Sequence, residues 1–429
     1  MDGAAAAGPL IGLFGAFDTG DLGEVALRRV IEAELRRRRP DIELVTMAPF
    51  GSERPVPGDD GRPARPLPSD PDGDLGLDAL IITGDVLASD AVWAARYAVA
   101  PDALSARDVA ALASAGMRGG RPAASQVIWF GVGGPDGTDV DVSVLAGRDV
   151  WVRDPATQER IGGTAVQSGD PLLLAARVFE PDTLRKRADL LRMCGVQPSG
   201  RRLVLEVTRG VQPPDMRDRL TEALTAALRA DPSLSLIVLT LNPTAPVASG
   251  VDIGGPVAAQ VHHLPEWVGL DDIAAAMSGA TAVVGMTAPG AHLAAALGTP
   301  VIALDSAGTA GQVAGIPTFA SDPTEQLAAL LAGGEPVEIA PATTSLDGAF
   351  AELALRLPAD RRSAAAAVSR DPIESALAVL QQRLVDERTA LQAELSRLQA
   401  EIEHLESSPE HRIARPLREG YQRWRRHRT

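Results

Sequence analysis

The sequence predicts an α/β protein with two doubly wound, Rossmann-like domains followed by a C-terminal α-helical coiled coil. Three observations support this prediction. Short apolar runs ending in glycine or polar residues alternate with amphipathic segments, as in parallel strands joined by helices. A chain of 429 residues is too long for one ordinary core. Leucines then recur every seven residues from Leu377 to Leu405.

The first predicted domain covers residues 9–180. It opens with the strand PLIGLFG, the turn AFDTGDLG and a helix from about Glu24 to Arg38. DIELVTMAP, DALIITG, QVIWFGVGG and DVWVRD supply further strands, and their continuous apolar character suits parallel strands buried on both faces. Residues 51–76, rich in Pro, Gly, Asp and Arg, are expected to form a mobile loop.

The second predicted domain covers residues 200–345 and is reached through a helix at about 182–195. RRLVLEV, LSLIVLTLNP, VHHLPEW, ATAVVGM and TPVIALD read as its strands, with helices near 271–278 and 290–297. Two such domains facing each other predict a GT-B-like arrangement, with ligands at the carboxyl ends of the strands. A helical return or linker is expected to follow this domain at residues 346–376.

The predicted coiled coil covers residues 377–408 and the basic tail residues 409–429. The heptad leucines are Leu377, Leu384, Leu391, Leu398 and Leu405. Their spacing favours a parallel homodimer through residues 377–405, and the alternative is a single helix packed on its own domain. The tail holds seven arginines and two glutamates. It is expected either to contact anionic lipid headgroups or an acidic partner, or to be a solvated chain end.

Composition narrows the function classes. A net charge of -15 argues against nucleic-acid binding, because phosphate affinity depends on Lys and Arg. The single cysteine, Cys194, excludes an internal disulfide, does not support a thiolate metal site and reads as a buried helix residue. The sequence shows neither a membrane-length apolar run nor a signal-peptide start, so we expect a cytoplasmic protein, peripheral at the inner membrane face if the tail binds lipid.

An ordered series of segments resembles the polysaccharide pyruvyl transferase family. The series is GAFDTGDLGEVAL, DALIITGDVLASD, WVRDPATQERIG with SGDPLLLA, EVTRG, LDDIAAAMSGATAVVGM and AHLAAALGTPVIALD. Together these segments cover roughly residues 9–305. Two departures accompany the resemblance. The family's glycine cluster is here Gly84, Asp85 and Val86, and its Arg-x-His register is here Thr287, Ala288 and Pro289.

The resemblance implies transfer of pyruvyl from phosphoenolpyruvate, the donor substrate, to two hydroxyls of a sugar, with no further cofactor. The acceptor would be a saccharide or lipid-linked saccharide precursor of a cell-envelope or extracellular polysaccharide. Pyruvyl transfer requires cations to bind the carboxylate and the phosphate, and one proton donor. Arg153 and Arg209 are the candidate cations and His292 the candidate acid, with His262 and His263 as the other histidines considered.

Further residues are candidates for substrate binding. They are Gly20, Asp21, Gly23, Gly84, Asp170 and Thr287. Glycines allow close backbone approach, and free amides at the start of a helix hold anions. Each candidate also has a structural interpretation: Arg153 pairs with Asp154 at the surface, Asp170 shapes a turn, and the histidines are satisfied core or edge residues. Asp85 is expected to repel a phosphate.

Two other functions remain open at this point. In one, the chain keeps the fold but has lost its reactive groups, and the coil and tail recruit other components of envelope polysaccharide synthesis. In the other, the chain is a GT-B-type glycosyltransferase that uses a nucleotide sugar. Binding of phosphoenolpyruvate distinguishes a pyruvyl transferase from both alternatives, because neither a scaffold nor a glycosyltransferase requires it.

Overall fold

The computed structural model describes most of the two predicted domains. The described residues are 8–49, 64–66, 77–87, 126–133, 145, 148–163, 165–207, 214–241, 253–265, 268–304, 315–319 and 323–360. Arg209, the predicted coiled coil at 377–408 and the basic tail at 409–429 lie outside these residues.

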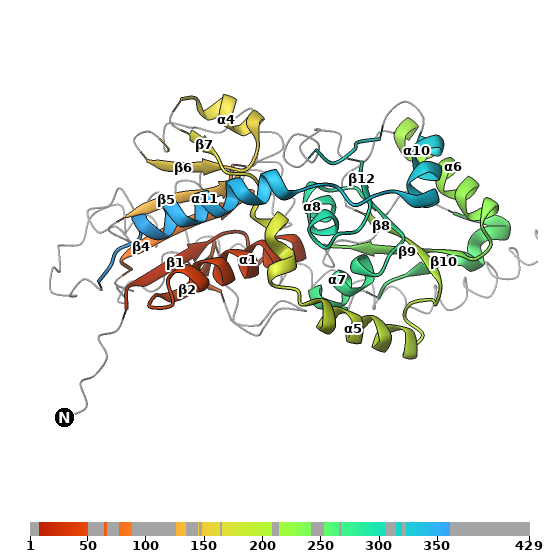
Figure 1. Ribbon diagram of the computed structural model, residues 1–429, viewed down its shortest axis with the longest axis horizontal. Helices are drawn as coiled ribbons and strands as arrows, with labels where there is room; N and C mark the ends of the chain where they lie inside the picture. The colour runs from red at the N-terminus through yellow and green to blue at the C-terminus, as the bar shows by residue number, and fades with distance from the viewer. Residues whose placement is uncertain are drawn as a thin grey trace, which may run out of the picture. The chain divides into compact units, whose positions relative to one another are not determined.

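Seven strands form the first sheet, in the order β3-β2-β1-β4-β5-β6-β7 (Figure 1). They are β1 Leu10–Phe14, β2 Glu43–Ala48, β3 Arg65–Pro66, β4 Ala79–Gly84, β5 Val127–Val132, β6 Asp149–Val152 and β7 Ala165–Gln167. Every pair is parallel. The strand order reverses between β1 and β4, so the loops after these two strands diverge and leave room at the carboxyl edge.

Five parallel strands form the second sheet, in the order β10-β9-β8-β11-β12. They are β8 Arg201–Val207, β9 Leu234–Thr240, β10 Val261–His263, β11 Ala282–Gly285 and β12 Val301–Ala303. Here the order reverses between β8 and β11. The two sheets confirm the predicted pair of doubly wound α/β domains.

Helices connect the strands in both domains. They are α1 Leu22–Arg38, α4 Pro155–Ile161, η2 Pro171–Arg177, α5 Pro181–Met193, α6 Pro214–Ala230, η3 Gly255–Gln260, α7 Leu270–Ser278, α8 Ala288–Ala296, α10 Pro323–Gly333 and α11 Ala340–Arg356. The helix expected from Glu24 begins two residues earlier, because the Asp21 side chain caps its first turn. Among the described residues, no helix has both the length and the apolar character needed to cross a membrane.

The last described helix, α11, packs on the first sheet although it follows the second in sequence (Figure 1). The ring centroid of Phe350 lies 4.6 Å from that of Phe130 on β5. The guanidinium of Arg356 lies 4.9 Å from the centre of the Trp151 ring on β6. Aromatic and cation–π contacts of this kind therefore hold α11 across two neighbouring strands.

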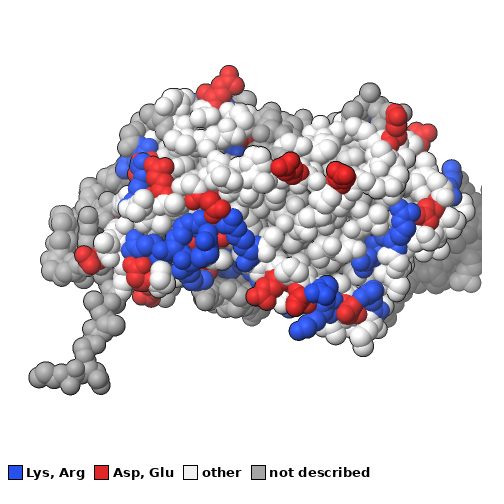
Figure 2. Space-filling model, viewed as in Figure 1, with Lys and Arg blue, Asp and Glu red and all other residues white. Residues whose placement is uncertain are grey.

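Basic side chains gather over α1 and η2 in Figure 2. Asp347 of α11 pairs with three of them, with its carboxylate 2.6 Å from Arg38, 2.7 Å from Arg177 and 3.4 Å from Arg37. Glu34, almost fully buried, also pairs with Arg37 and Arg38. This surface is therefore a charge network that ties α11 to α1 and η2.

Two expectations need correction. Part of the predicted loop at 51–76 is a short strand, since Arg65–Pro66 pairs with β2, where Met47 and Ala48 provide the partners. Cys194 is exposed at the C-terminal end of α5. It is not buried because the helix ends there and turns through Gly195, whose φ is 69°.

Candidate functional site

The start of α1 lies at the junction of the two domains. The Asp21 carboxylate accepts hydrogen bonds from the amides of Gly23, at 2.8 Å, and Glu24, at 3.4 Å. The Leu22 amide donates across the junction to the carbonyl of Leu241, at 2.6 Å. The expectation of free amides at this helix end is therefore wrong, because the chain itself satisfies them.

Three of the predicted glycines are needed for this geometry. Gly20 has a φ of 79° and Gly84 a φ of 81°, a backbone region that other residues rarely adopt. The Glu24 carboxylate lies over Gly84 where a Cβ would be, and its Oε1 accepts the Asp85 amide at 3.2 Å. A Cβ on Gly23 would lie 3.1 Å from Pro289 of α8. Close approach of α1, β4 and α8 thus explains these glycines without a ligand.

Arg153 follows β6 and is 7% exposed. Its guanidinium pairs with the Asp85 carboxylate and lies against Gly133, where a side chain would collide with it. Asp154 instead caps α4 by accepting from the Thr157 amide at 2.7 Å. The interpretation of a surface Arg153–Asp154 pair is therefore wrong. Arg153 balances the charge of Asp85, so the expected repulsion of phosphate by Asp85 is largely cancelled.

Asp170 and His292 join the two domains through their side chains. The imidazole Nδ1 of His292, on α8, lies 2.8 Å from Oδ2 of Asp170, which precedes η2. Both side chains are almost completely buried. Asp170 also accepts the Leu172 amide at 2.9 Å, so the turn predicted for it is present as well. One carboxylate thus shapes the start of η2 and orients a histidine of the other domain.

The ionisation of Asp170 fixes the direction of this hydrogen bond. Burial alone would raise the pKa of Asp170, but the charge and hydrogen bond of His292, with the charge of Arg153, hold it below its ordinary value. An ionised carboxylate only accepts, so Nδ1 carries the proton. The other ring nitrogen, Nε2, is buried and has no hydrogen-bond partner among the described residues. A carboxylate-oriented imidazole with an unused nitrogen has the form of an acid–base group.

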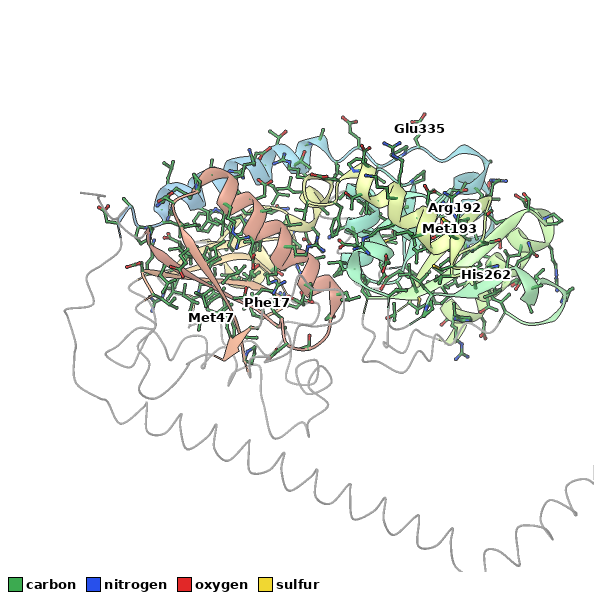
Figure 3. All side chains as sticks on the ribbon, turned by 90° about the horizontal axis from the view of Figure 1, so that it is seen from below. Phe17, Met47, Arg192, Met193, His262 and Glu335 are labelled. Atoms are coloured by element: carbon green, nitrogen blue, oxygen red, sulfur yellow. The ribbon has the colours of Figure 1, made fainter. Side chains whose placement is uncertain are left out.

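His262 and His263 do not join this site. They lie on β10, the edge strand of the second sheet, and Figure 3 labels His262 there. Two strands separate β10 from β11, which corresponds to roughly 14 Å at the usual strand spacing. The structure therefore leaves His292 as the histidine at the junction within the described part of the chain.

Glu206 is a further residue of the junction, and the sequence did not single it out. Its Oε2 accepts the amides of Met286, at 2.9 Å, and Thr287, at 3.0 Å, just before α8. Thr287 in turn caps α8, because its hydroxyl accepts the Gly290 amide at 3.1 Å. A carboxylate within the otherwise apolar run LVLEV was the available signal. The start of α8, like that of α1, is thus already occupied by a carboxylate of the protein.

Comparison with known proteins gives a fold and no family. The sequence matches no family model and no curated protein. Among solved structures, the chain is similar to UDP-GlcNAc 2-epimerase from Methanocaldococcus jannaschii in complex with UDP-GlcNAc and UDP, with a TM-score of 0.50. The two sequences are 11% identical, and the match covers 80% of this chain and 97% of that one.

Two further structures have lower scores. MnaA of S. aureus, in a co-structure with UDP, has a TM-score of 0.49 at 10% identity, over 83% of this chain and 99% of that one. The E. coli ADP-heptose LPS heptosyltransferase II has a TM-score of 0.42 at 13% identity, over 76% and 98%. These two scores are too low to support a conclusion, and the similarity at a TM-score of 0.50 shows the fold alone, two Rossmann-like domains in a GT-B-like arrangement.

The junction brings together most of the predicted site residues. Gly20, Asp21, Gly23, Gly84, Arg153, Asp170, Thr287 and His292 all lie on the segments that meet there. Arg209 lies outside the described residues. No group of three or more His, Cys, Asp or Glu residues suited to a metal ion occurs in the part of the chain that the structure describes.

Proposed function

We propose that this chain is a sugar-modifying enzyme built on the GT-B plan, with His292 as its acid–base group. One observation carries the proposal: Asp170 of the first domain orients His292 of the second, while Nε2 of the same ring has no partner among the described residues. Asp170 follows β7 and His292 lies on the helix that follows β11, and open α/β sheets bind ligands beyond the carboxyl ends of their strands. Nε2 is enclosed, so a ligand reaches it when the two domains separate.

The more specific proposal is pyruvyl transfer from phosphoenolpyruvate to a saccharide or lipid-linked saccharide, supported by the resemblance over residues 9–305. Two sugar hydroxyls bond to C2 of the enolpyruvyl unit and the C2–O bond to phosphate breaks. Of the two hydroxyl protons, one ends on C3, which becomes a methyl group, and the other leaves with phosphate. His292 would deliver the proton to C3. Arg209, which lies outside the described residues, and Arg153 would supply the cations for the carboxylate and phosphate.

A second candidate is a catalytically silent scaffold for envelope polysaccharide synthesis. It is favoured by the carboxylates of Asp21 and Glu206, which take up amides at the two helix ends nearest the junction. Those amides would otherwise be the natural phosphate donors. The His292–Asp170 pair would then serve only to hold the domains together.

Turnover separates these candidates. Release of phosphate from phosphoenolpyruvate is measured with a panel of acceptor saccharides, and release of UDP from UDP-GlcNAc is measured in parallel. We expect phosphate release that falls about 100-fold or more in His292→Gln. His263→Gln, on the exposed edge of the second sheet, is the matched control and should retain the rate. UDP release alone would favour glycosyl transfer, and neither release, together with no phosphoenolpyruvate binding, would favour the scaffold.

A further inference from the structure

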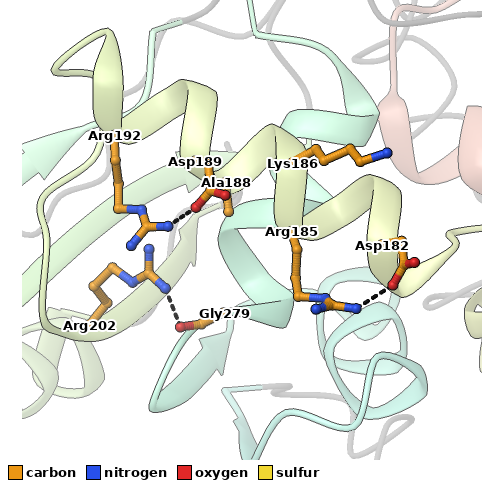
Figure 4. A pocket seen from close by; sticks show the side chains of 8 residues that line it. All are labelled: Asp182, Arg185, Lys186, Ala188, Asp189, Arg192, Arg202 and Gly279. Atoms are coloured by element: carbon orange, nitrogen blue, oxygen red, sulfur yellow. Dashed lines mark hydrogen bonds and ion pairs between the residues drawn. The ribbon is translucent and has the colours of Figure 1, made fainter.

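A second polar site lies away from the domain junction. It is a pocket of about 410 Å³ between α5, the start of β8 and the end of α7 (Figure 4). Its lining residues include four cations, Arg185, Lys186, Arg192 and Arg202. Arg202 and Glu206 are four residues apart on β8, roughly 13 Å in a strand. The pocket therefore lies at the amino-terminal ends of the strands of the second sheet, whereas the His292–Asp170 pair lies beyond their carboxyl ends.

Arg202 is the unusual member of this group. It is only 8% exposed, and its Nη2 donates to the carbonyl of Gly279 at the end of α7. Its Nε and Nη1 are buried and have no hydrogen-bond partner among the described residues. A guanidinium stays charged at every physiological pH. Burying it with one acceptor is unfavourable unless a further group compensates it.

Arg192 brings a second guanidinium next to that of Arg202. In Figure 4 its guanidinium lies beside that of Arg202. Two adjacent cations repel each other, and burial and the charge of Arg192 both lower the pKa of Arg202. The C-terminal end of α7 explains the hydrogen bond from Arg202 to the Gly279 carbonyl, because Arg side chains often bind the last carbonyls of a helix. It does not explain why a second guanidinium lies next to Arg202.

The charges of the pocket specify the missing group. Asp182 pairs with Arg185 and Asp189 pairs with Arg192, so both acidic side chains are already neutralised. Lys186 and Arg202 form no ion pair with any residue that the structure describes. Two positive charges thus remain, and a phosphomonoester carries close to two negative charges at neutral pH. The volume is within the range of small-molecule pockets, about 300 to 1,000 Å³, and exceeds what a bare phosphate needs.

We propose that this pocket binds the dianionic phosphate group of a small phosphomonoester between Arg192 and Arg202. The phosphate oxygens accept a donor from Arg192, and they accept the unused Nε–H and Nη1–H of Arg202 once its guanidinium turns to expose these buried atoms, with Lys186 balancing the second charge. The site is independent of the reaction at the domain junction, so its occupancy is measured by binding and not by turnover.

Calorimetric titration of the full chain with glucose 1-phosphate, inorganic phosphate and glucose at pH 8 tests the proposal. We expect saturable binding of glucose 1-phosphate, binding of inorganic phosphate at least ten-fold weaker, and none of glucose. Arg192→Gln and Arg202→Met should each weaken glucose 1-phosphate binding ten-fold or more. Arg201→Met is the matched control, because Arg201 pairs with Asp231 outside the pocket. It should change the Kd less than two-fold.

Several outcomes would overturn the site. They are the absence of saturable binding, or a Kd unchanged in both Arg192→Gln and Arg202→Met. Equal affinity for phosphate and glucose 1-phosphate would overturn the choice of a phosphomonoester over free phosphate. Binding lost in His292→Gln but kept in Arg192→Gln would assign the ligand to the junction instead. Arg192 is an exposed residue, so Arg192→Gln keeps the test decisive even if Arg202→Met does not fold.

Discussion

At the scale of single residues, the junction depends on carboxyl groups in unequal environments. Asp170 is ionised because His292 and Arg153 compensate its burial. Glu206 accepts two backbone amides and has no cationic partner among the described residues. Burial raises its pKa to about 7, with a further contribution from the charge of Asp21. The ionisation of Glu206 therefore changes near neutral pH.

The stability of the folded chain should fall as pH rises from about 4.5 to about 7 because of Glu206. In this window the unfolded chain has released a proton that the folded chain still holds. The free energy of unfolding therefore decreases as pH rises. Glu206→Gln keeps the acceptor for Met286 and Thr287 and removes the titration. The free energy of unfolding of this variant, relative to that of the wild type, should increase by about 3 kcal/mol between pH 4.5 and pH 8, as measured by urea unfolding.

Glu24→Gln is the comparison for this experiment. Glu24 is also buried at the junction and accepts a backbone amide, that of Asp85. A pH dependence that persists in Glu206→Gln and disappears in Glu24→Gln would move the titration to Glu24 and contradict the account.

Gly84→Ala should destabilise the chain by about 2 kcal/mol or more, because a side chain at a φ of 81° is strained and the Glu24 carboxylate lies where the new Cβ would be. Gly163→Ala is the control, since Gly163 has no positive φ and no atom within 4 Å of its added Cβ. It should change stability by less than about 0.5 kcal/mol. Equal effects in chemical denaturation would show that Gly84 is not constrained as described.

At the scale of elements, α11 depends on charge as well as on aromatic packing. The hydrogen bond from Arg177 and the charges of Arg177 and Arg38 lower the pKa of Asp347 to about 2. A lowered pKa contributes stability that is present above the ordinary value of 3.8 and is lost as pH falls towards 2.

Asp347→Asn should therefore loosen α11 at pH 7 and have little effect at pH 2. Hydrogen exchange of the α11 amides measures this directly, and faster exchange confined to α11, α1 and η2 is the expected result. Asp182→Asn, which removes an exposed pair within α5, is the control and should leave α11 unchanged. Exchange in α11 that does not respond to Asp347→Asn would assign its attachment to Phe350 and Arg356 alone.

The sequence predicts most strands well for a physical reason. Parallel strands are buried on both faces, so β1, β4 and β5 are continuous apolar runs that no helix pattern competes with. The site is predicted less completely. Asp170 and His292 were each singled out, but they are 122 residues apart and lie in different domains, so their pairing follows only from the topology. Glu206 was missed because one carboxyl in a strand carries no periodic signal.

At the scale of the whole molecule, the predicted coiled coil gives the assembly a testable state. Leu384→Asp with Leu398→Asp places charge at two heptad core positions and should convert a dimer to a monomer in sedimentation velocity. Gln382→Asp with Gln392→Asp, outside the leucine positions, is the control and should leave the dimer intact. A wild-type monomer, or a dimer that survives the leucine changes, would contradict dimerisation through residues 377–405.

If His292 meets a ligand at the domain junction, the nitrogen resonances of its imidazole ring must respond to that ligand. Full-length protein labelled with ¹⁵N-histidine is titrated with phosphoenolpyruvate, and His292→Gln identifies the signals of this ring among the six histidines. We predict that Nε2 shifts saturably while Nδ1, held by Asp170, moves little. Signals of His292 that stay unchanged at saturating phosphoenolpyruvate would contradict the claim and leave the His292–Asp170 pair as a structural contact between the domains.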